Sequence, residues 1–103
     1  MGYYTSHSFD VPNAPELIKV FRAECENAAF SLTETGYPSE SSKWYDQEDD
    51  MKNFSAKHPG ILMIAEGVGD DPDDRWREYY MDGKMQNAQV RTVYNEFDAS
   101  KLV

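Results

Sequence analysis

The chain lacks most of the features from which a reaction or a compartment is usually inferred. It has one cysteine, Cys25, so an intrachain disulfide is excluded, and the surrounding pattern predicts an inert thiol on the apolar face of a helix. The longest apolar run, Ile61 to Ala65, is too short to span a membrane, and the first residues lack the basic and apolar regions of a secretory signal. We therefore expect a reducing, cytoplasmic location.

Basic residues are also scarce. The sequence has 19 acidic and 10 basic residues, which gives a formal net charge of −9. A surface of this sign repels nucleic-acid backbones and anionic membranes, so we expect neither as a direct partner. Much of the negative charge lies in two acidic clusters. The first contains Asp46, Glu48, Asp49 and Asp50, and the second contains Asp70, Asp71, Asp73 and Asp74.

Motifs for catalysis and for metal binding are missing as well. No phosphate-binding glycine loop, nucleophile elbow or kinase signature is present. A calcium loop starting at Asp71 would have Arg75 at a ligand position and would lack its central glycine. His7, His58 and Cys25 lie on separate predicted elements, so they form no zinc motif. We therefore expect a protein that is not an enzyme and that uses no metal or other cofactor.

Apolar periodicity and turn residues divide the chain into alternating elements. Residues 28–35 fit either a helical extension or a short strand, and the strand is favoured. Asp46 and Asp49 have the spacing of an acidic capping box at a helix start, and Pro59-Gly60 ends that helix. The expected elements are a strand over 3–11, a helix over 15–27, a strand over 28–35, a helix over 46–57, a buried strand over 61–66, and strands over 75–81 and 84–94.

The last two strands are joined by the clearest local signal, Asp82-Gly83, because a type I′ turn needs positive φ at both central residues. The resulting register pairs Met81 with Lys84, Tyr79 with Gln86, Arg77 with Ala88 and Arg75 with Val90. The face that carries Tyr79, Met81, Ala88 and Val90 is expected to point inward. Trp76, Tyr80 and Met85 would then form an outer apolar patch. Two arginines on the inward face argue against this choice, which stays open.

Several segments resemble a family of small bacteriophage proteins. They are the opening Met-Gly-Tyr-Tyr-Thr, Lys43-Trp44-Tyr45-Asp46 with Met51 and Ser55, Pro59 before an apolar strand, Trp76 with Asp82-Gly83-Lys84-Met85-Gln86, and Phe97 to Leu102. The loop over 67–74 departs from the family's Gly-Glu-Glu pattern. The chain is more distantly similar to phage and plasmid proteins with a ferredoxin-like domain. This resemblance implies a phage origin and a fold, and it transfers no catalytic residue.

The predicted fold is a single α+β domain over residues 1–103. It should have a mainly antiparallel sheet of four to five strands, with two helices packed on one face. The ferredoxin-like fold is the nearest named architecture.

The acidic clusters carry the expected function. Acids three or four positions apart on a helix lie about 5–6 Å from each other and can resemble a row of phosphates. We therefore expect a phage protein that binds and inhibits a host nucleic-acid-processing or defence protein with a basic groove, as a DNA mimic of anti-restriction or anti-CRISPR type. Its partner-binding residues would be the two acidic clusters, with Trp76 and Tyr80 as aromatic anchors. An equally weighted interpretation is that the acids only solubilise the domain and cap a helix.

Two other functions stay open. An interaction adaptor or self-associating module, such as a homodimer, would use the outer sheet face, and its binding would survive salt. A small metal- or nucleotide-binding protein would instead gain stability from its ligand.

Overall fold

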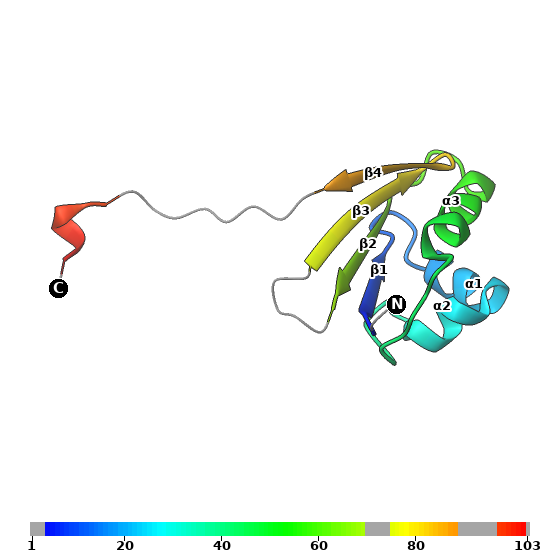
Figure 1. Cartoon of the computed structure of the whole chain (residues 1–103). Coiled ribbons are helices and arrows are strands. Elements are labelled where there is room, and N and C mark those ends of the chain that lie inside the picture. Colours follow the sequence, from blue (N-terminus) through cyan, green and yellow to red (C-terminus); the bar gives the residue numbers. More distant parts are fainter. Residues whose placement is uncertain (1–3, 70–74, 89–96, 103) are drawn as a thin grey trace.

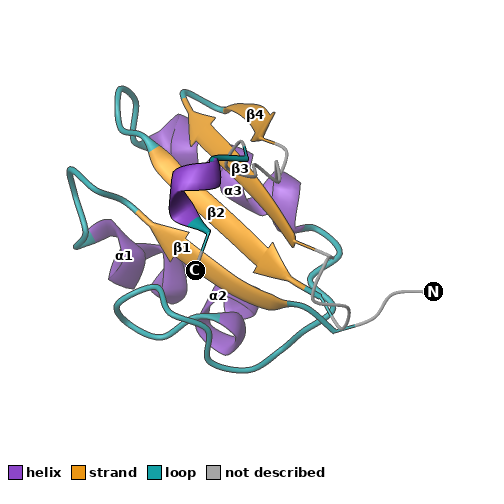
Figure 2. Ribbon diagram, turned by 90° about the vertical axis from the view of Figure 1, so that its left-hand side faces the viewer, coloured by secondary structure: helices purple, strands orange, loops and turns teal. Residues whose placement is uncertain are grey.

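The computed structural model describes residues 4–69, 75–88 and 97–102. It has an α+β fold in which helices cover one face of an antiparallel sheet (Figure 1), while Figure 2 looks onto the face that α1, α2 and α3 leave open. The elements are β1 (Ser6–Asp10), α1 (Leu17–Glu24), α2 (Glu26–Ser31), α3 (Gln47–Lys57), β2 (Met63–Val68), β3 (Arg75–Met81), β4 (Lys84–Ala88) and a short 3-10 turn, η1 (Ala99–Lys101).

The four strands lie in chain order, β1-β2-β3-β4, and every neighbouring pair is antiparallel. All three α-helices therefore belong to the connection between β1 and β2. The predicted hairpin is confirmed between β3 and β4, where Asp82 and Gly83 have φ values of 54° and 77°. Its register is also confirmed over the described residues, from the pair Met81 and Lys84 to the pair Arg77 and Ala88. The predicted pairing of Arg75 with Val90 lies outside the described residues.

The prediction of a strand over 28–35 is wrong. Cys25 takes an extended conformation that ends α1, and a second helix, α2, follows at once. Ala28 and Leu32, four positions apart, are both fully buried, which is the spacing of one helical face and not of a strand. From this segment only an isolated bridge, between Leu32 and Pro38, has strand-like pairing. The described sheet consequently has four strands under three helices, whereas we expected only two helices.

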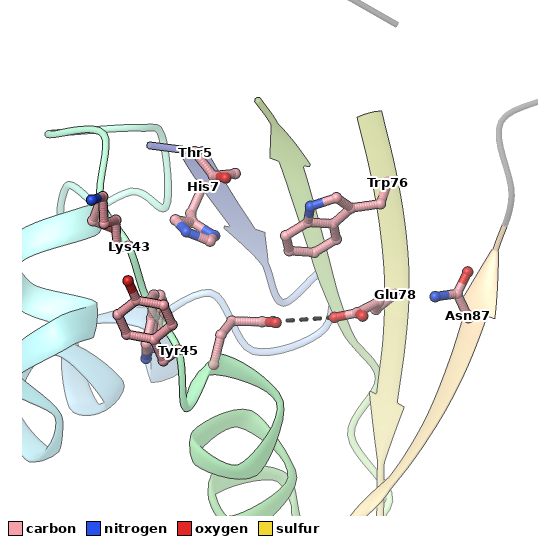
Figure 3. Close-up of a pocket in the computed structure, with 10 residues that line it drawn as sticks. Thr5, His7, Lys43, Tyr45, Trp76, Glu78 and Asn87 are labelled. Carbon is pink, nitrogen blue, oxygen red and sulfur yellow. Dashed lines mark hydrogen bonds between the residues drawn. The ribbon is translucent and has the colours of Figure 1, made fainter. Parts of the chain in front are cut away.

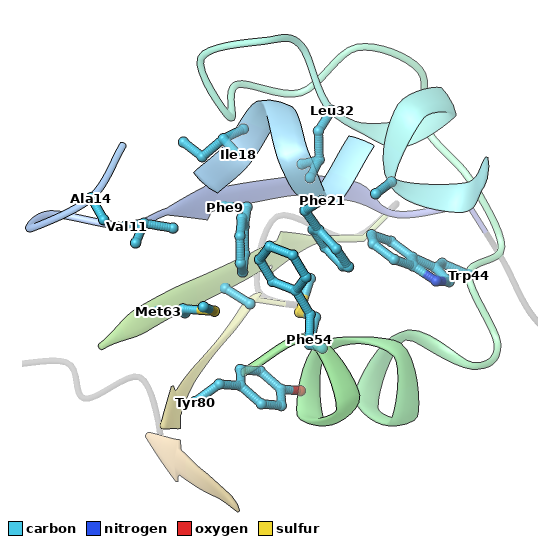
Figure 4. Close-up of a cluster of buried hydrophobic side chains, with 13 residues drawn as sticks. Phe9, Val11, Ala14, Ile18, Phe21, Leu32, Trp44, Phe54, Met63 and Tyr80 are labelled. Carbon is cyan, nitrogen blue, oxygen red and sulfur yellow. The ribbon is translucent and has the colours of Figure 1, made fainter. Parts of the chain in front are cut away.

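The core lies between the helices and the inner face of the sheet (Figure 4). The Phe21 ring stacks on Phe54 with 4.6 Å between centroids, and Phe9 lies 5.0 Å from Phe21. These three rings join β1, α1 and α3, and each fully buried side chain of this size contributes about 1.5–3 kcal/mol relative to exposure. Met51 and Met63 fill the space beside them and are also fully buried.

The expected assignment of hairpin faces is wrong. Tyr80 is fully buried, and Trp76 and Met85 pack against the core, so this set of residues faces the helices. Tyr79, Met81 and the arginines of β3 lie on the open face. The physical reason is the cost of burying charge, because a guanidinium on the open face can stay hydrated. Arg77 pairs there with Glu66 of β2 at 3.1 Å.

Within residues 4–69, 75–88 and 97–102, no helix is long and apolar enough to cross a membrane.

Candidate functional site

A cleft of about 490 Å³ opens where the start of α3 meets the sheet (Figure 3). We call it the aromatic cleft, because Trp44, Tyr45 and Trp76 line it together with His7 and Glu78. These residues come from β1, the segment before α3, and β3. The fold brings them together. β1 and β3 lie on either side of β2, so side chains on their inner faces point toward the same helix layer. The site is therefore a product of the tertiary fold.

Trp76 packs against the backbone of β2 at Gly67. Its cross-strand partner is Gly67, and a Cβ atom built on Gly67 would collide with the Trp76 indole. The glycine thus allows the ring to lie against the backbone of β2, next to the core. Any larger residue at this position would push the indole out of its place in the cleft.

A hydrogen bond to Asp50 of α3 holds the Trp44 side chain. Its indole Nε1 donates to Asp50 Oδ2 at 2.8 Å, and Cys25 Sγ donates to the same oxygen at 3.5 Å. Burial is the main cause that raises the pKa of the Cys25 thiol, which keeps this donor protonated. Asp50, one of the predicted partner-binding acids, therefore has a structural partner at Cys25, between α1 and α2, and fixes the orientation of Trp44.

His7 lies at the back of the aromatic cleft, between the two indoles. Its ring centroid is 5.3 Å from that of Trp44 and 5.8 Å from that of Trp76, both edge to face. The side chain is 3% exposed, and neither ring nitrogen has a hydrogen-bond partner among the described residues. Burial lowers the pKa of His7 to about 4, so the imidazole is neutral near pH 7. Unpaired buried nitrogens are costly, which makes this position unusual for a purely structural residue.

Glu78 brings a carboxylate to the cleft. Its Oε1 accepts hydrogen bonds from the Tyr80 hydroxyl at 2.7 Å and from Gln47 Nε2 at 3.2 Å. Burial first, and then the bond to Glu78, raise the pKa of Tyr80 far above its ordinary value, so the phenol stays a donor. Within the described part of the chain, no hydrogen bond reaches the second oxygen, Oε2. Glu78 can therefore accept further bonds from an occupant of the cleft.

The exposed acids of the first acidic cluster lie beside two cleft residues along the chain. Tyr45 and Gln47 line the cleft, and the exposed Asp46, Glu48 and Asp49 alternate with or follow them in the first turn of α3. Glu48 pairs with Lys52 at 2.9 Å, a surface pair that adds little stability. Asp46 is the N-cap of α3, but its side chain accepts no capping bond, so the expected capping box is not formed.

The second acidic cluster, Asp70, Asp71, Asp73 and Asp74, lies outside the described residues. The expectation that it contributes to binding stays a prediction. Across the three described ranges, no group of three or more His, Cys, Asp or Glu side chains is placed to hold a metal ion.

The sequence singled out Trp76 and the acids of α3, but not His7 or Glu78 as cleft residues. In the sequence, His7 alternates with Thr5, Phe9 and Val11 along the first strand, a pattern that indicates one face of a sheet. The contact of His7 with the two tryptophans depends on the strand order and on the packing of Trp76 over Gly67. A local sequence pattern shows neither of these.

A scan against protein-family models and searches of curated proteins and of solved structures found no match to this chain. Among the described residues, the aromatic cleft and the acidic turn that follows Tyr45 are the features that point to a function.

Proposed function

We propose that this chain is a non-enzymatic phage protein that binds and inhibits a host nucleic-acid-processing or defence protein in the cytoplasm of the infected cell. In this proposal it acts as a DNA mimic of anti-restriction or anti-CRISPR type. The observation that carries the proposal is that three exposed acids, Asp46, Glu48 and Asp49, follow or flank in sequence two residues, Tyr45 and Gln47, that line the aromatic cleft.

Each part of this surface has a role in the proposed binding. The acids attract a basic groove and accelerate association, while buried aromatic contacts supply most of the affinity in protein interfaces. Trp76 keeps its predicted role as an anchor, because it is half-buried and lines the cleft. Tyr80 is buried and supports Glu78, and Asp50 supports Trp44, so neither is proposed as a direct contact.

A ferredoxin-like relationship is proposed only for the two layers, an antiparallel sheet under helices. Ferredoxin-like domains alternate their elements as β-α-β-β-α-β. Here three helices separate β1 from β2, and the strands follow in chain order.

The proposal is tested by capture of host proteins at low and at high salt. The full chain should capture a nucleic-acid-binding protein at low salt, inhibit its activity, and lose it to a competing DNA duplex or to added salt. The variant Asp46→Lys/Asp49→Lys should lose the partner. A matched reversal, Glu16→Lys/Glu26→Lys, changes two exposed acids elsewhere on the helix layer and should retain it. Equal capture by both variants would contradict the proposal.

A second candidate, a self-associating module, is favoured by apolar side chains on the open sheet face. Val68 and Met81 are each 39% exposed, and Tyr79 lies on the same face. In this case a homodimer would form whose stability is insensitive to salt. Sedimentation of the chain and of Met81→Lys over a range of concentrations decides it, and a monomer at every concentration rules it out.

A further inference from the structure

We propose that the aromatic cleft receives an arginine side chain that the partner protein presents. This inference rests on the proposed function, and it names the chemical group by which a basic partner is recognised. It follows from three properties of the cleft: a carboxylate whose Oε2 accepts no hydrogen bond from the described residues, aromatic walls, and a neutral imidazole.

The carboxylate sets the charge of the occupant. Glu78 is half-buried, and its Oε1 already accepts two hydrogen bonds from Tyr80 and Gln47. An anion beside Glu78 would be repelled by this carboxylate. The exposed Lys43 also lines the cleft, and its ammonium lies 5.1 Å from the centroid of the Tyr4 ring. A cation that carries several N–H donors would reach Oε2 and make a charge-assisted bond.

The walls set the shape of the occupant. Two indoles and the ring of Tyr45 line the cleft, and Tyr45 is 77% exposed at its edge. A guanidinium is planar, is weakly hydrated, and stacks on aromatic faces while its edge donates hydrogen bonds. The ammonium of lysine is a compact and strongly hydrated point charge, which gains less from such walls. Arginine therefore fits better than lysine.

The imidazole of His7 agrees with a cationic occupant. Because it is neutral, it does not repel a positive charge at the back of the cleft. Both nitrogens of His7 are buried and without a partner among the described residues, so the ring contributes a neutral wall and no exposed acceptor. The cleft thus combines one carboxylate with aromatic faces around one space.

The test uses the two tryptophans as reporters, because the chain has only two and both line the cleft. The full chain is titrated with three acetylated, amidated peptides, Gly-Arg-Gly, Gly-Lys-Gly and Gly-citrulline-Gly, while tryptophan fluorescence and amide NMR shifts are recorded. We expect saturable binding of the arginine peptide with a Kd on the order of 1 mM, several-fold weaker binding of the lysine peptide and none of citrulline. Equal responses to all three peptides, or no response to arginine, would overturn the inference.

Three variants assign the response to the cleft. Glu78→Gln removes the charge but keeps an oxygen that can accept from Tyr80 and Gln47, and Tyr45→Ala removes an exposed ring. Each should weaken arginine binding about tenfold. Glu16→Gln makes the same charge change beyond the opposite end of β1 from the cleft, and its Kd should match that of the unmodified chain. Unchanged binding by Glu78→Gln would place the arginine elsewhere and overturn the inference.

The two proposals fail in different ways. Capture of an inhibited host protein without any arginine response overturns the arginine site and leaves the proposed function standing. Specific arginine binding without a captured partner supports the arginine site and overturns the proposed function.

Discussion

Trp76 lies over Gly67, its cross-strand partner, and the indole fills the space that a side chain at position 67 would need. The two residues act as one unit. Gly67 has no side chain to pack on this face of β2. The Trp76 indole fills that space and forms a wall of the aromatic cleft. The shape of the cleft therefore depends on a residue that has no side chain.

Gly67→Ala should displace the Trp76 ring and destabilise the domain. Overpacking of this kind costs about 1–3 kcal/mol, and urea unfolding measures it. A double-mutant cycle supplies the control, because Gly67→Ala should be nearly neutral when Trp76 is already replaced by Ala. If the cost of Gly67→Ala is the same in both backgrounds, the steric relationship is not its cause.

His7 should make the domain less stable in mild acid. Its folded pKa of about 4 is below the ordinary value of 6.5, so between these values the unfolded chain binds a proton that the folded chain does not. This contribution to stability is complete above about pH 6.5, decreases as the pH falls, and is lost near pH 4, a change of about 3 kcal/mol.

The measurement for His7 compares urea unfolding at pH 7.5 and pH 4.5 for the chain and for His7→Phe. Phenylalanine keeps an aromatic ring between the two indoles and removes the titrating nitrogens. All other side chains are the same in both proteins, so their effects cancel in the difference. An equal loss of stability in the two proteins would show that His7 is not protonated on unfolding as expected.

Asp49 and Asp50 are adjacent acids that should respond differently to truncation. Asp50→Ala removes the acceptor of the Trp44 indole and of the Cys25 thiol, which should cost about 1–3 kcal/mol. Asp49→Ala changes an exposed side chain and should stay within about 0.5 kcal/mol of the unmodified chain. Thermal unfolding of both variants checks this. Similar melting temperatures would mean that the Trp44 bond is not important for stability.

Local signals predicted the parts of this fold that local physics determines. The Asp82-Gly83 turn fixed a hairpin and its register, and the acidic start and Pro59-Gly60 end bracketed α3 to within one residue at its start. Residues 28–35 were ambiguous, because short apolar runs fit both periods. The sequence also did not determine which face of the hairpin is buried, because that depends on the face of the sheet against which the helices pack.

The cleft was beyond prediction for a related reason. Its residues come from β1, from the segment before α3, and from β3 and β4, and they meet only once the strand order is known. Trp76 was identified from its residue type and Asp50 from its charge. The structure separates their roles by burial and by hydrogen bonds, which a sequence pattern does not show.

Ser55 should be the residue through which α3 fixes the hairpin. It is fully buried, its Oγ donates to the Lys52 carbonyl at 2.9 Å, and the same oxygen accepts from the Gly83 amide at 2.9 Å. Ser55→Ala leaves that amide without its acceptor and should cost about 1–2 kcal/mol in urea unfolding. Hydrogen exchange at the Gly83 amide should accelerate, because its protecting bond is lost. Ser41→Ala, an exposed serine outside the helices, is the control. Unchanged exchange at Gly83 in Ser55→Ala would show that this bond does not hold the turn against α3.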